Sequence, residues 1–293
     1  MCTFADGKVP IECKTMMKKY ILDLRVCSVE PVGGRCVLLR LTDDKPLPEM
    51  CPGQFVEVRI DHTPSTLLRR PISVCFVDRE SNELWLLVAA VGDGTRHLAA
   101  LKAGDVLNCV LPLGNGWMAI PNSPEKGDFP AESEGKAPFS GRFGGAPLLV
   151  GGGVGVAPLL YLGAELKKRG CKPTFLLGAR TASDLLMLDE FRRYGRVFVT
   201  TEDGSEGERG FVTNHSLLGQ EQFSHIYTCG PKPMMVAVAR LADKLGVTCE
   251  ASLENMMACG LGACLCCVEK TTEGNLCVCK EGPVFDTKRL LWN

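Results

Sequence analysis

Hydrophobic and polar residues alternate in several short runs of the first third of the chain, as is typical of half-buried β-strands. In one of them, residues 54–60, Phe55, Val56 and Val58 stand among polar partners. The other runs cover residues 20–29, 35–41, 71–77, 83–91 and 105–111. A Val-Gly-Gly turn at residues 32–34 indicates a hairpin. Several short strands with turns between them predict a small antiparallel β-barrel over residues 19–118. Only residues 97–101 look helical there, with Thr95 as the expected N-cap.

From residue 146 the pattern changes to buried strands that alternate with helices. A short apolar strand at residues 147–150 leads into a glycine-rich turn at 151–155 and a helix that ends at Lys168. Further strands are expected at 174–178, 196–200 and 225–229, and further helices at 184–194, capped by Ser183, and at 234–245. The alternation predicts a Rossmann-like parallel α/β domain over residues 146–251. Residues 119–145, rich in Pro, Gly, Ser and charge, are expected to form a surface linker.

Composition and charge narrow the range of partners. The net charge is −1, which implies no general attraction to nucleic acid or anionic lipid. The N-terminal stretch has no apolar core of signal-peptide length. Residues 143–164 are uncharged, but their seven glycines and two prolines fit a strand, a turn and a helix better than a membrane span. The 16 cysteines, in a chain that shows no export signal, predict a cytoplasmic protein in a reducing compartment.

Six of these cysteines fall between Cys259 and Cys279, in a C-terminal segment that we assign to residues 252–293. Cys259, Cys264 and Cys267 follow the C-x4-C-x2-C spacing of plant-type [2Fe–2S] ligation, and a fourth cysteine comes after a short polar hairpin. A zinc site would favour two separated C-x2-C pairs, and a disulfide framework would suit a secreted chain. Spacing alone does not choose between Cys277 and Cys279 as the fourth ligand.

Two stretches of the predicted barrel suggest phosphate binding. The arginine in the run Arg70-Pro71-Ile72-Ser73 can fork onto a pyrophosphate, and the serine hydroxyl can reach a ring nitrogen. The run Val91-Gly92-Asp93-Gly94-Thr95 places glycine backbone before a helix, which suits an anion. Taken alone, the first stretch is more often a surface turn and the second is more often a loop.

Together the two stretches resemble the flavin-binding barrel of the ferredoxin–NADP reductase superfamily. The resemblance implies bound FAD, with FMN open as an alternative. It also implies a set of flavin-binding residues, namely Arg70, Pro71, Ile72, Ser73, Leu87, Val88, Ala89, Gly94 and Thr95. Ile72 replaces the aromatic residue that this family usually stacks on the flavin.

The later runs GGGVGVAP, GART and YTCGPKPMM resemble the pyridine-nucleotide half of the same superfamily. The resemblance implies that Ser73 and Cys229 lie at the site of hydride transfer, although Cys229 alone would also suit a core thiol. Arg180 could bind the 2′-phosphate of NADP or only shape a turn, so the preference for NADH rests on the resemblance. The implied nucleotide-binding residues are Gly151, Gly152, Gly153, Gly155, Gly230 and Pro231.

The closing runs ACGLGACLCCVEK and CKEGPVFDTKRLLW narrow the resemblance to the electron-transfer subunits of class 1B dihydroorotate dehydrogenase. It covers roughly residues 20–293 and implies that Cys279 is the fourth ligand. It also implies electron flow between NAD(H), FAD, the [2Fe–2S] cluster and the FMN of a catalytic partner. The implied partner oxidises dihydroorotate to orotate in pyrimidine synthesis, and the implied assembly is a heterotetramer.

The surface for that partner is expected to include Met256, Met257 and Leu261, which could equally be core residues. The four histidines lie scattered outside these motifs, so substrate chemistry is assigned to the partner. Two alternatives remain open: a subunit of an NAD(P)H–ferredoxin or sulfite reductase-type complex, and a non-enzymatic metal-binding scaffold.

Overall fold

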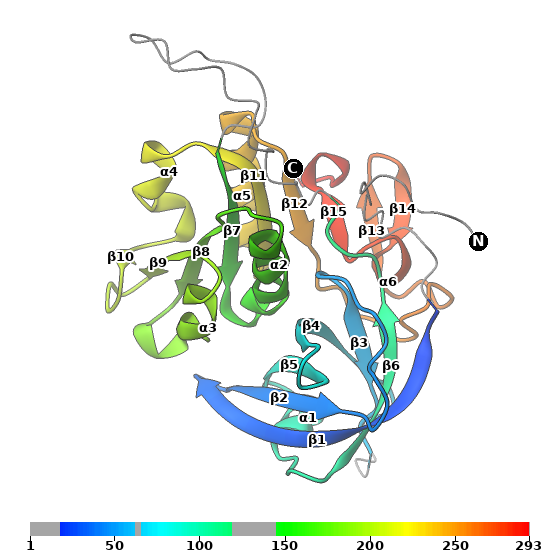
Figure 1. The fold of residues 1–293 in the computed structure, drawn as a ribbon. Helices are drawn as coiled ribbons and strands as arrows, with labels where there is room; N and C mark the ends of the chain where they lie inside the picture. Colours follow the sequence, from blue (N-terminus) through cyan, green and yellow to red (C-terminus); the bar gives the residue numbers. More distant parts are fainter. Residues whose placement is uncertain (1–17, 62–65, 119–144, 293) are drawn as a thin grey trace, which may run out of the picture.

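An antiparallel barrel, a parallel sheet flanked by helices and a small C-terminal module lie against one another in the computed structural model, which describes residues 18–61, 66–118 and 145–292 (Figure 1). The linker expected at residues 119–145 lies, except for Gly145, outside the described residues. No helix in the described ranges is long and apolar enough to cross a membrane.

Six antiparallel strands close the barrel in the order β1-β2-β5-β4-β3-β6. They are β1 (Tyr20–Gly33), β2 (Cys36–Thr42), β3 (Phe55–Val58), β4 (Arg70–Asp78), β5 (Glu83–Ala89) and β6 (Val106–Leu113). Val56 and Val58 are fully buried in the barrel core, together with Leu39 and Leu86 from other strands. The predicted antiparallel barrel is confirmed.

The helix of the barrel, α1 (Asp93–Ala99), begins four residues before the expected start. Gly92 is its N-cap, and the Thr95 hydroxyl accepts the Gly92 backbone N–H at 3.0 Å. The prediction that Thr95 caps a helix over 97–101 was therefore wrong. Thr95 instead supplies the reciprocal bond of a capping box from inside the first turn.

The second sheet has seven strands in the order β10-β9-β8-β7-β11-β12-β15, all parallel except β15. Apolar residues cover both of its faces: Leu149 and Phe175 pack with α2 on the barrel side, and Leu148 and Ile226 pack with α5 on the other. The strands are β7 (Ala146–Gly152), β8 (Thr174–Ala179), β9 (Arg196–Thr201), β10 (Glu208–Arg209), β11 (Phe223–Cys229), β12 (Cys249–Ser252) and β15 (Val284–Asp286). The helices are α2 (Ala157–Lys168), α3 (Leu188–Arg192), α4 (Leu217–Gln220) and α5 (Lys232–Leu245), with 3-10 turns η1 (Gly153–Val156), η2 (Ala182–Asp184) and η3 (Val212–Asn214).

One predicted helix of this domain is broken. The segment expected to be helical over 184–194 consists of η2, an extended Leu185 and the short α3, and Ser183 lies inside η2 instead of capping a helix. Met187 adopts a left-handed backbone with φ of 55°, which separates the two pieces. The break buries Leu186 in the core against the barrel, and the Ser183 carbonyl accepts the Gly34 N–H of the β1–β2 hairpin at 3.1 Å. Tertiary contacts therefore override the local helical pattern.

The C-terminal module consists of the hairpin β13 (Val268–Thr271) and β14 (Gly274–Cys277), the short α6 (Val278–Glu281), β15 and the turn η4 (Thr287–Arg289). It shares a hydrophobic core with the barrel, since Phe55 and Leu113 pack in the same cluster as Phe285. The Asn115 side chain, after β6, also donates to the carbonyls of Lys280 and Glu281 at 3.0 and 3.1 Å. The module is thus joined to the sheet through β15 and to the barrel through this core.

Candidate functional site

The two predicted flavin stretches meet at the rim of the barrel. A Cβ atom on Gly94 would lie 2.9 Å from Arg70 Nε, so the glycine leaves the space that the arginine occupies. Arg70 also donates to the Leu68 carbonyl at 2.8 Å, which holds its side chain along this rim. The Thr95 hydroxyl is used in the helix cap, so its backbone N–H is the group left to face a phosphate.

Beside this rim, two neighbouring strands separate. The ladder between β4 and β5 ends at the pair Val74–Leu86, so residues 70–73 and 87–89 lie beyond its last pair, on facing edges. Residues 70–73 pair with β3 and residues 87–89 pair with β2 on their outer sides. The Leu87 and Val88 side chains are buried, which leaves their backbone for a ligand. An opening lined by backbone edges beside an arginine fits a flat ring with a pyrophosphate tail.

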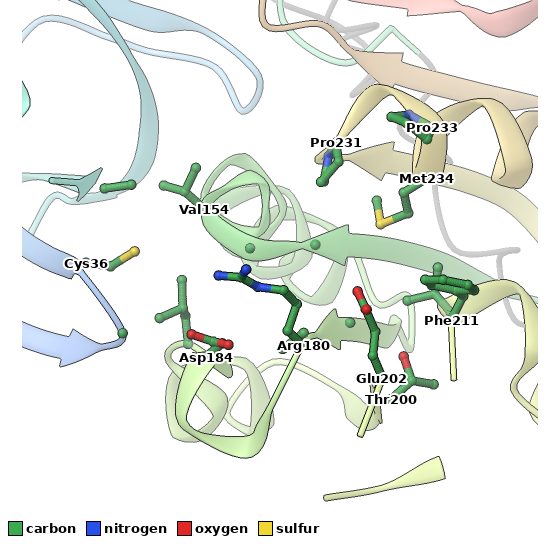
Figure 2. Close-up of a pocket in the computed structure, with 18 of the residues that line it drawn as sticks. Cys36, Val154, Arg180, Asp184, Thr200, Glu202, Phe211, Pro231, Pro233 and Met234 are labelled. Carbon is green, nitrogen blue, oxygen red and sulfur yellow. The ribbon is translucent and has the colours of Figure 1, made fainter. Parts of the chain in front are cut away.

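A cavity of about 1080 Å³ lies between the barrel and the carboxyl ends of β7, β8, β9 and β11 (Figure 2). Ligands of open α/β sheets bind at this edge. Gly152, Gly153 and Pro231, three of the residues nominated for nucleotide binding, line the cavity. Gly153 has φ of 55° and open space where a Cβ would stand, so its backbone can approach a ligand closely.

Three other predicted glycines bring elements together and do not line the cavity. A Cβ on Gly151 would lie 2.9 Å from Leu159 Cδ1, and a Cβ on Gly155 would lie 2.5 Å from the Gly230 Cα atom. The turn before α2 therefore packs directly on the loop that follows β11. Gly230 has φ of 151° and needs to be glycine for its conformation as well.

Cys229, at the end of β11, is fully buried. Burial raises the pKa of its thiol well above the ordinary value, the nearby Glu254 raises it further, and a hydrogen bond with the Ser252 side chain lowers it. The thiol is therefore neutral at physiological pH. Glu254 was missed by the sequence analysis, because only the pairing of β11 with β12 brings the ends of these strands together.

The cavity also contains acidic residues that the sequence analysis missed. Glu202 directly follows β9, and Figure 2 shows its carboxylate and the Arg180 guanidinium inside the same cavity. Asp184 lines the wall beside the β1–β2 hairpin. The signal for Glu202 was an acidic residue immediately after a predicted parallel strand, at the sheet edge where ligands of open α/β sheets bind.

The four predicted cluster ligands form two pairs. Cys259 and Cys264 pair within the loop before β13, and Cys267, at the end of that loop, pairs with Cys279 in α6. Burial favours the neutral thiol of Cys259, but the N–H groups of Leu261, Cys264 and Ala263 and the Cys264 thiol outweigh it and lower its pKa to about 6. Burial, followed by the Cys267 thiol, raises the pKa of Cys279 to about 12. The Gly262 N–H points to Cys279 Sγ at 3.1 Å, and the Cys279 N–H points to Cys267 Sγ at 3.3 Å.

This pairing bears on whether the cysteines hold a single zinc ion or a two-iron cluster. Within the described part of the chain, no three His, Cys, Asp or Glu side chains converge on one point that could hold a single metal ion. Two thiol pairs are what a two-iron cluster requires, since each iron takes two cysteine ligands. Cys277 Sγ lies 4.0 Å from the Gly262 carbonyl oxygen and receives no such N–H bond from the residues that the structure describes, and Cys266 is exposed. The geometry therefore favours Cys279 over Cys277.

Comparison with known proteins agrees with this arrangement. A family model for the iron–sulfur cluster binding domain of dihydroorotate dehydrogenase B matches residues 254–291, and one for the oxidoreductase NAD-binding domain matches residues 149–240. The chain is 38% identical to the dihydroorotate dehydrogenase B (NAD(+)) electron transfer subunit of Lysinibacillus sphaericus (strain C3-41), over 89% of this chain and 95% of the relative. The Listeria monocytogenes serotype 4a (strain HCC23) subunit of the same name is 38% identical, over 90% and 96%.

Solved structures show the same fold. The structure of an NADH-dependent reduced ferredoxin–NADP oxidoreductase superposes with a TM-score of 0.75 and 28% identity, over 92% of this chain and 90% of the other. Phthalate dioxygenase reductase shares the fold at a TM-score of 0.55 and 20% identity, over 76% and 64%.

The barrel, the nucleotide-binding sheet and the paired cysteines define the class of pyridine-nucleotide-dependent electron-transfer reductases with the ferredoxin–NADP reductase fold. Within this class, the chain belongs to the family of dihydroorotate dehydrogenase B (NAD(+)) electron transfer subunits. The family, the fold class, the oxidoreductase function and the cofactors FAD, [2Fe–2S] and NAD(H) that were expected from the sequence are thereby confirmed.

Proposed function

We propose that this chain carries electrons between NAD(H) and the FMN of a catalytic partner that oxidises dihydroorotate to orotate, in a heterotetramer. The observation that carries the proposal is the order of three sites on one chain. The nucleotide cavity reaches barrel residues Cys36 and Ala89, and Ala89 belongs to the opening between β4 and β5. The cysteine loop contacts β3 of the same barrel through Gly260.

We assign the ligand-binding roles to the residues nominated from the sequence, within the same four parts: 19–118, 119–145, 146–251 and 252–293. Arg70 and the backbone of Gly94 and Thr95 would hold the flavin pyrophosphate, and residues 71–73 and 87–89 would flank the ring. Gly152, Gly153 and Pro231 would contact the nicotinamide nucleotide, while Gly151, Gly155 and Gly230 shape its site. Cys259 and Cys264 would bind one iron, and Cys267 and Cys279 the other. The cytoplasmic location stays a prediction.

The protein's own contribution is to hold, order and shield these groups. FAD, when bound, supplies two-electron exchange with NADH and one-electron exchange with the cluster. The fully buried thiol of Cys229 is neutral, and we assign it to the predicted hydride-transfer position, where it would add no charge. Ser73, in β4 opposite Phe55, would donate to the flavin ring from the other side.

The partner surface that we propose lies on the cysteine loop. Met256, Leu265 and Leu261 are 84%, 64% and 48% exposed, and an exposed apolar group at an electron exit suits a protein interface. Met257, in contrast, packs against the core that the module shares with the barrel. The proposed contact therefore excludes Met257.

The variant Cys264→Ser tests the order in which electrons pass between NADH, FAD and the cluster. It removes one thiol of the Cys259–Cys264 pair, so the cluster's visible absorption and EPR signal should be lost, while FAD-dependent reduction of a dye by NADH is largely retained. Cys266→Ser is the matched control, because Cys266 is exposed and outside both pairs, and it should keep the cluster. Loss of dye reduction in Cys264→Ser with FAD still bound would refute the serial order of the sites.

A second candidate is a subunit of a ferredoxin-linked reductase. The observation that favours it is the similarity to the NADH-dependent reduced ferredoxin–NADP oxidoreductase structure over 92% of this chain. The protein that co-purifies with the chain separates the two: an FMN-containing dihydroorotate-oxidising subunit supports the first candidate, and a ferredoxin-linked complex supports the second. A colourless preparation would instead support the non-enzymatic scaffold.

A further inference from the structure

Glu57 is an ionisable residue inside the protein that the mechanism above does not use. It lies in β3 between Val56 and Val58, and only 1% of its surface is exposed. Neither carboxylate oxygen has a hydrogen-bond partner among the described residues. Burying a carboxylate without a partner is costly, so its retention calls for a function or a compensating neighbour.

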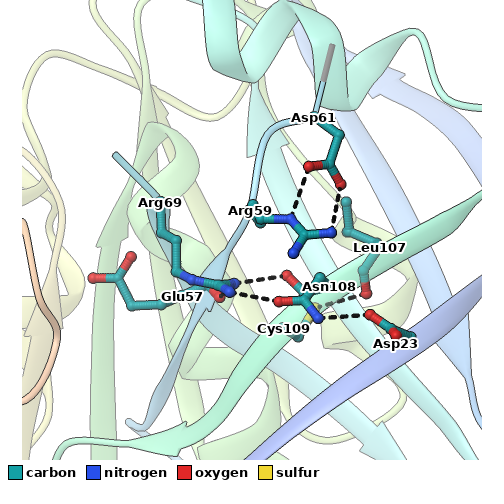
Figure 3. Close-up of polar contacts among 8 residues, drawn as sticks. All are labelled: Asp23, Glu57, Arg59, Asp61, Arg69, Leu107, Asn108 and Cys109. Atoms are coloured by element: carbon teal, nitrogen blue, oxygen red, sulfur yellow. Dashed lines mark hydrogen bonds and ion pairs between the residues drawn. The ribbon is translucent and has the colours of Figure 1, made fainter. Parts of the chain in front are cut away.

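Arg69, the cation with the largest effect on the pKa of Glu57, forms no hydrogen bond with its carboxylate. Arg69 donates to the Glu57 backbone carbonyl at 3.2 Å and to the Asn108 carbonyl at 3.0 Å, and its guanidinium also contacts the Asn108 side chain. Asn108 in turn donates to Asp23 at 2.6 Å. Figure 3 shows this chain of contacts, with the Glu57 carboxyl group pointing away from the Arg69 guanidinium. Arg70 is held along the barrel rim near Gly94.

The carboxyl group instead faces the cysteine loop. A Cβ on Gly260 would lie 2.7 Å from Glu57 Cγ and 3.1 Å from Oε1, so the loop approaches the carboxyl group as closely as a glycine allows. Gly260 directly follows Cys259, and its φ of 65° turns the chain at this point. Glu57 is also paired with Pro71 of the flavin-binding run. Its charge therefore lies between the flavin edge and the cluster loop.

We infer that Glu57 is a positioning residue whose buried negative charge opposes the addition of an electron to the [2Fe–2S] cluster and so lowers its reduction potential. The inference rests on the proposed function, because it needs the cluster to be held by this loop. A charge in a poorly solvated site acts more strongly than one at the surface, since neither water nor salt screens it. Burial is also the main cause that raises the pKa of Glu57 to about 7, against the lowering effect of Arg69.

The test is a redox titration of the full chain, loaded with FAD and cluster at pH 8.5, followed by the EPR signal of the reduced cluster. Glu57→Gln should raise the equilibrium constant for one-electron reduction roughly 10-fold, which corresponds to about 59 mV. Glu57→Asp keeps the charge and should stay close to the wild type. The matched control is Asp61→Asn, which removes one negative charge from an exposed carboxylate that Arg59 holds at 2.7 and 3.1 Å, and it should shift the constant less than twofold.

An unchanged potential in Glu57→Gln, or an equal shift in Asp61→Asn, would overturn the inference. Glu57→Met provides a second neutral variant in case the glutamine variant loads poorly. Failure of both neutral variants to bind the cluster, with Glu57→Asp loading normally, would assign Glu57 a structural role instead. A wild-type chain that binds no cluster after reconstitution would reject the proposed function itself.

Discussion

The contact between Gly155 and Gly230 makes a sharp prediction about the nucleotide site. Gly155 lies in the turn before α2, and its φ lies outside the left-handed region that favours glycine, so an alanine there meets no conformational barrier. A Cβ at this position would, however, lie 2.5 Å from Gly230 Cα and 2.6 Å from Gly230 N. These are backbone atoms, which cannot rotate aside as the end of a side chain can. Gly155→Ala must therefore push the turn and the loop after β11 apart.

The size of the effect follows from the overlap. Overpacking a tight core contact by one methyl group typically costs about 1–3 kcal/mol. Each kcal/mol lowers the melting temperature by about 2–4 °C for a unit of this size. The loop that moves carries Pro231, which lines the nucleotide cavity. NADH binding should therefore weaken together with stability, while the flavin edge and the cysteine loop stay unchanged.

Thermal unfolding measures the predicted loss of stability, and the KM for NADH in dye reduction measures the predicted weakening of NADH binding. The matched control is Gly219→Ala in α4, where nothing lies within 4 Å of the added Cβ atom. That substitution should leave KM unchanged and keep or slightly raise stability, because alanine is favoured over glycine in a helix by about 1 kcal/mol. A Gly155→Ala variant with wild-type melting temperature and KM would show that the turn and the loop are not in contact.

Two further predictions concern specificity and assembly. Glu202→Ser should reduce the preference for NADH over NADPH about 10-fold or more in kcat/KM, because it removes a carboxylate that would repel a 2′-phosphate by about 1–4 kcal/mol. The control is Asp203→Asn, which changes an adjacent carboxylate. Equal preferences in both variants would contradict the role of Glu202. Met256→Glu should weaken association with the catalytic partner in size-exclusion chromatography. Leu245→Glu, which changes an exposed leucine on α5, is the control and should not weaken it. Equal association of both variants would show that the cysteine loop is not part of the interface.

The sequence correctly predicts the elements that are specified by the hydrophobic pattern within their own residues. Alternation in residues 54–60 is sufficient for β3, because one face of that strand fills the barrel core with Val56 and Val58. The same alternation does not reveal that Glu57 and Phe55 on the opposite face are buried under the C-terminal module. Burial on that face comes from a segment about 200 residues away in sequence, which no local pattern contains.

The misplaced helices have similar explanations. Thr95 has the chemistry of an N-cap, but its hydroxyl can serve the helix from its third position as well, and the extended backbone of Gly92 decides between the two. The segment 184–194 has helical spacing, yet the contact of Ser183 with the hairpin tip and the burial of Leu186 favour a break. Both outcomes depend on neighbours that only the folded chain supplies.

The position of the C-terminal module explains why the cysteine motif needs the rest of this chain. The hairpin β13–β14 has two strands, which by themselves are marginally stable in water. Its stability must therefore come from β15, which extends the nucleotide-binding sheet, and from the core shared with Phe55 and Leu113 of the barrel. Because the same contacts hold the cysteine loop against β3, any motion that separates the loop from the barrel must also expose this core. The structure thus couples the distance between the proposed flavin and cluster sites to the stability of the module.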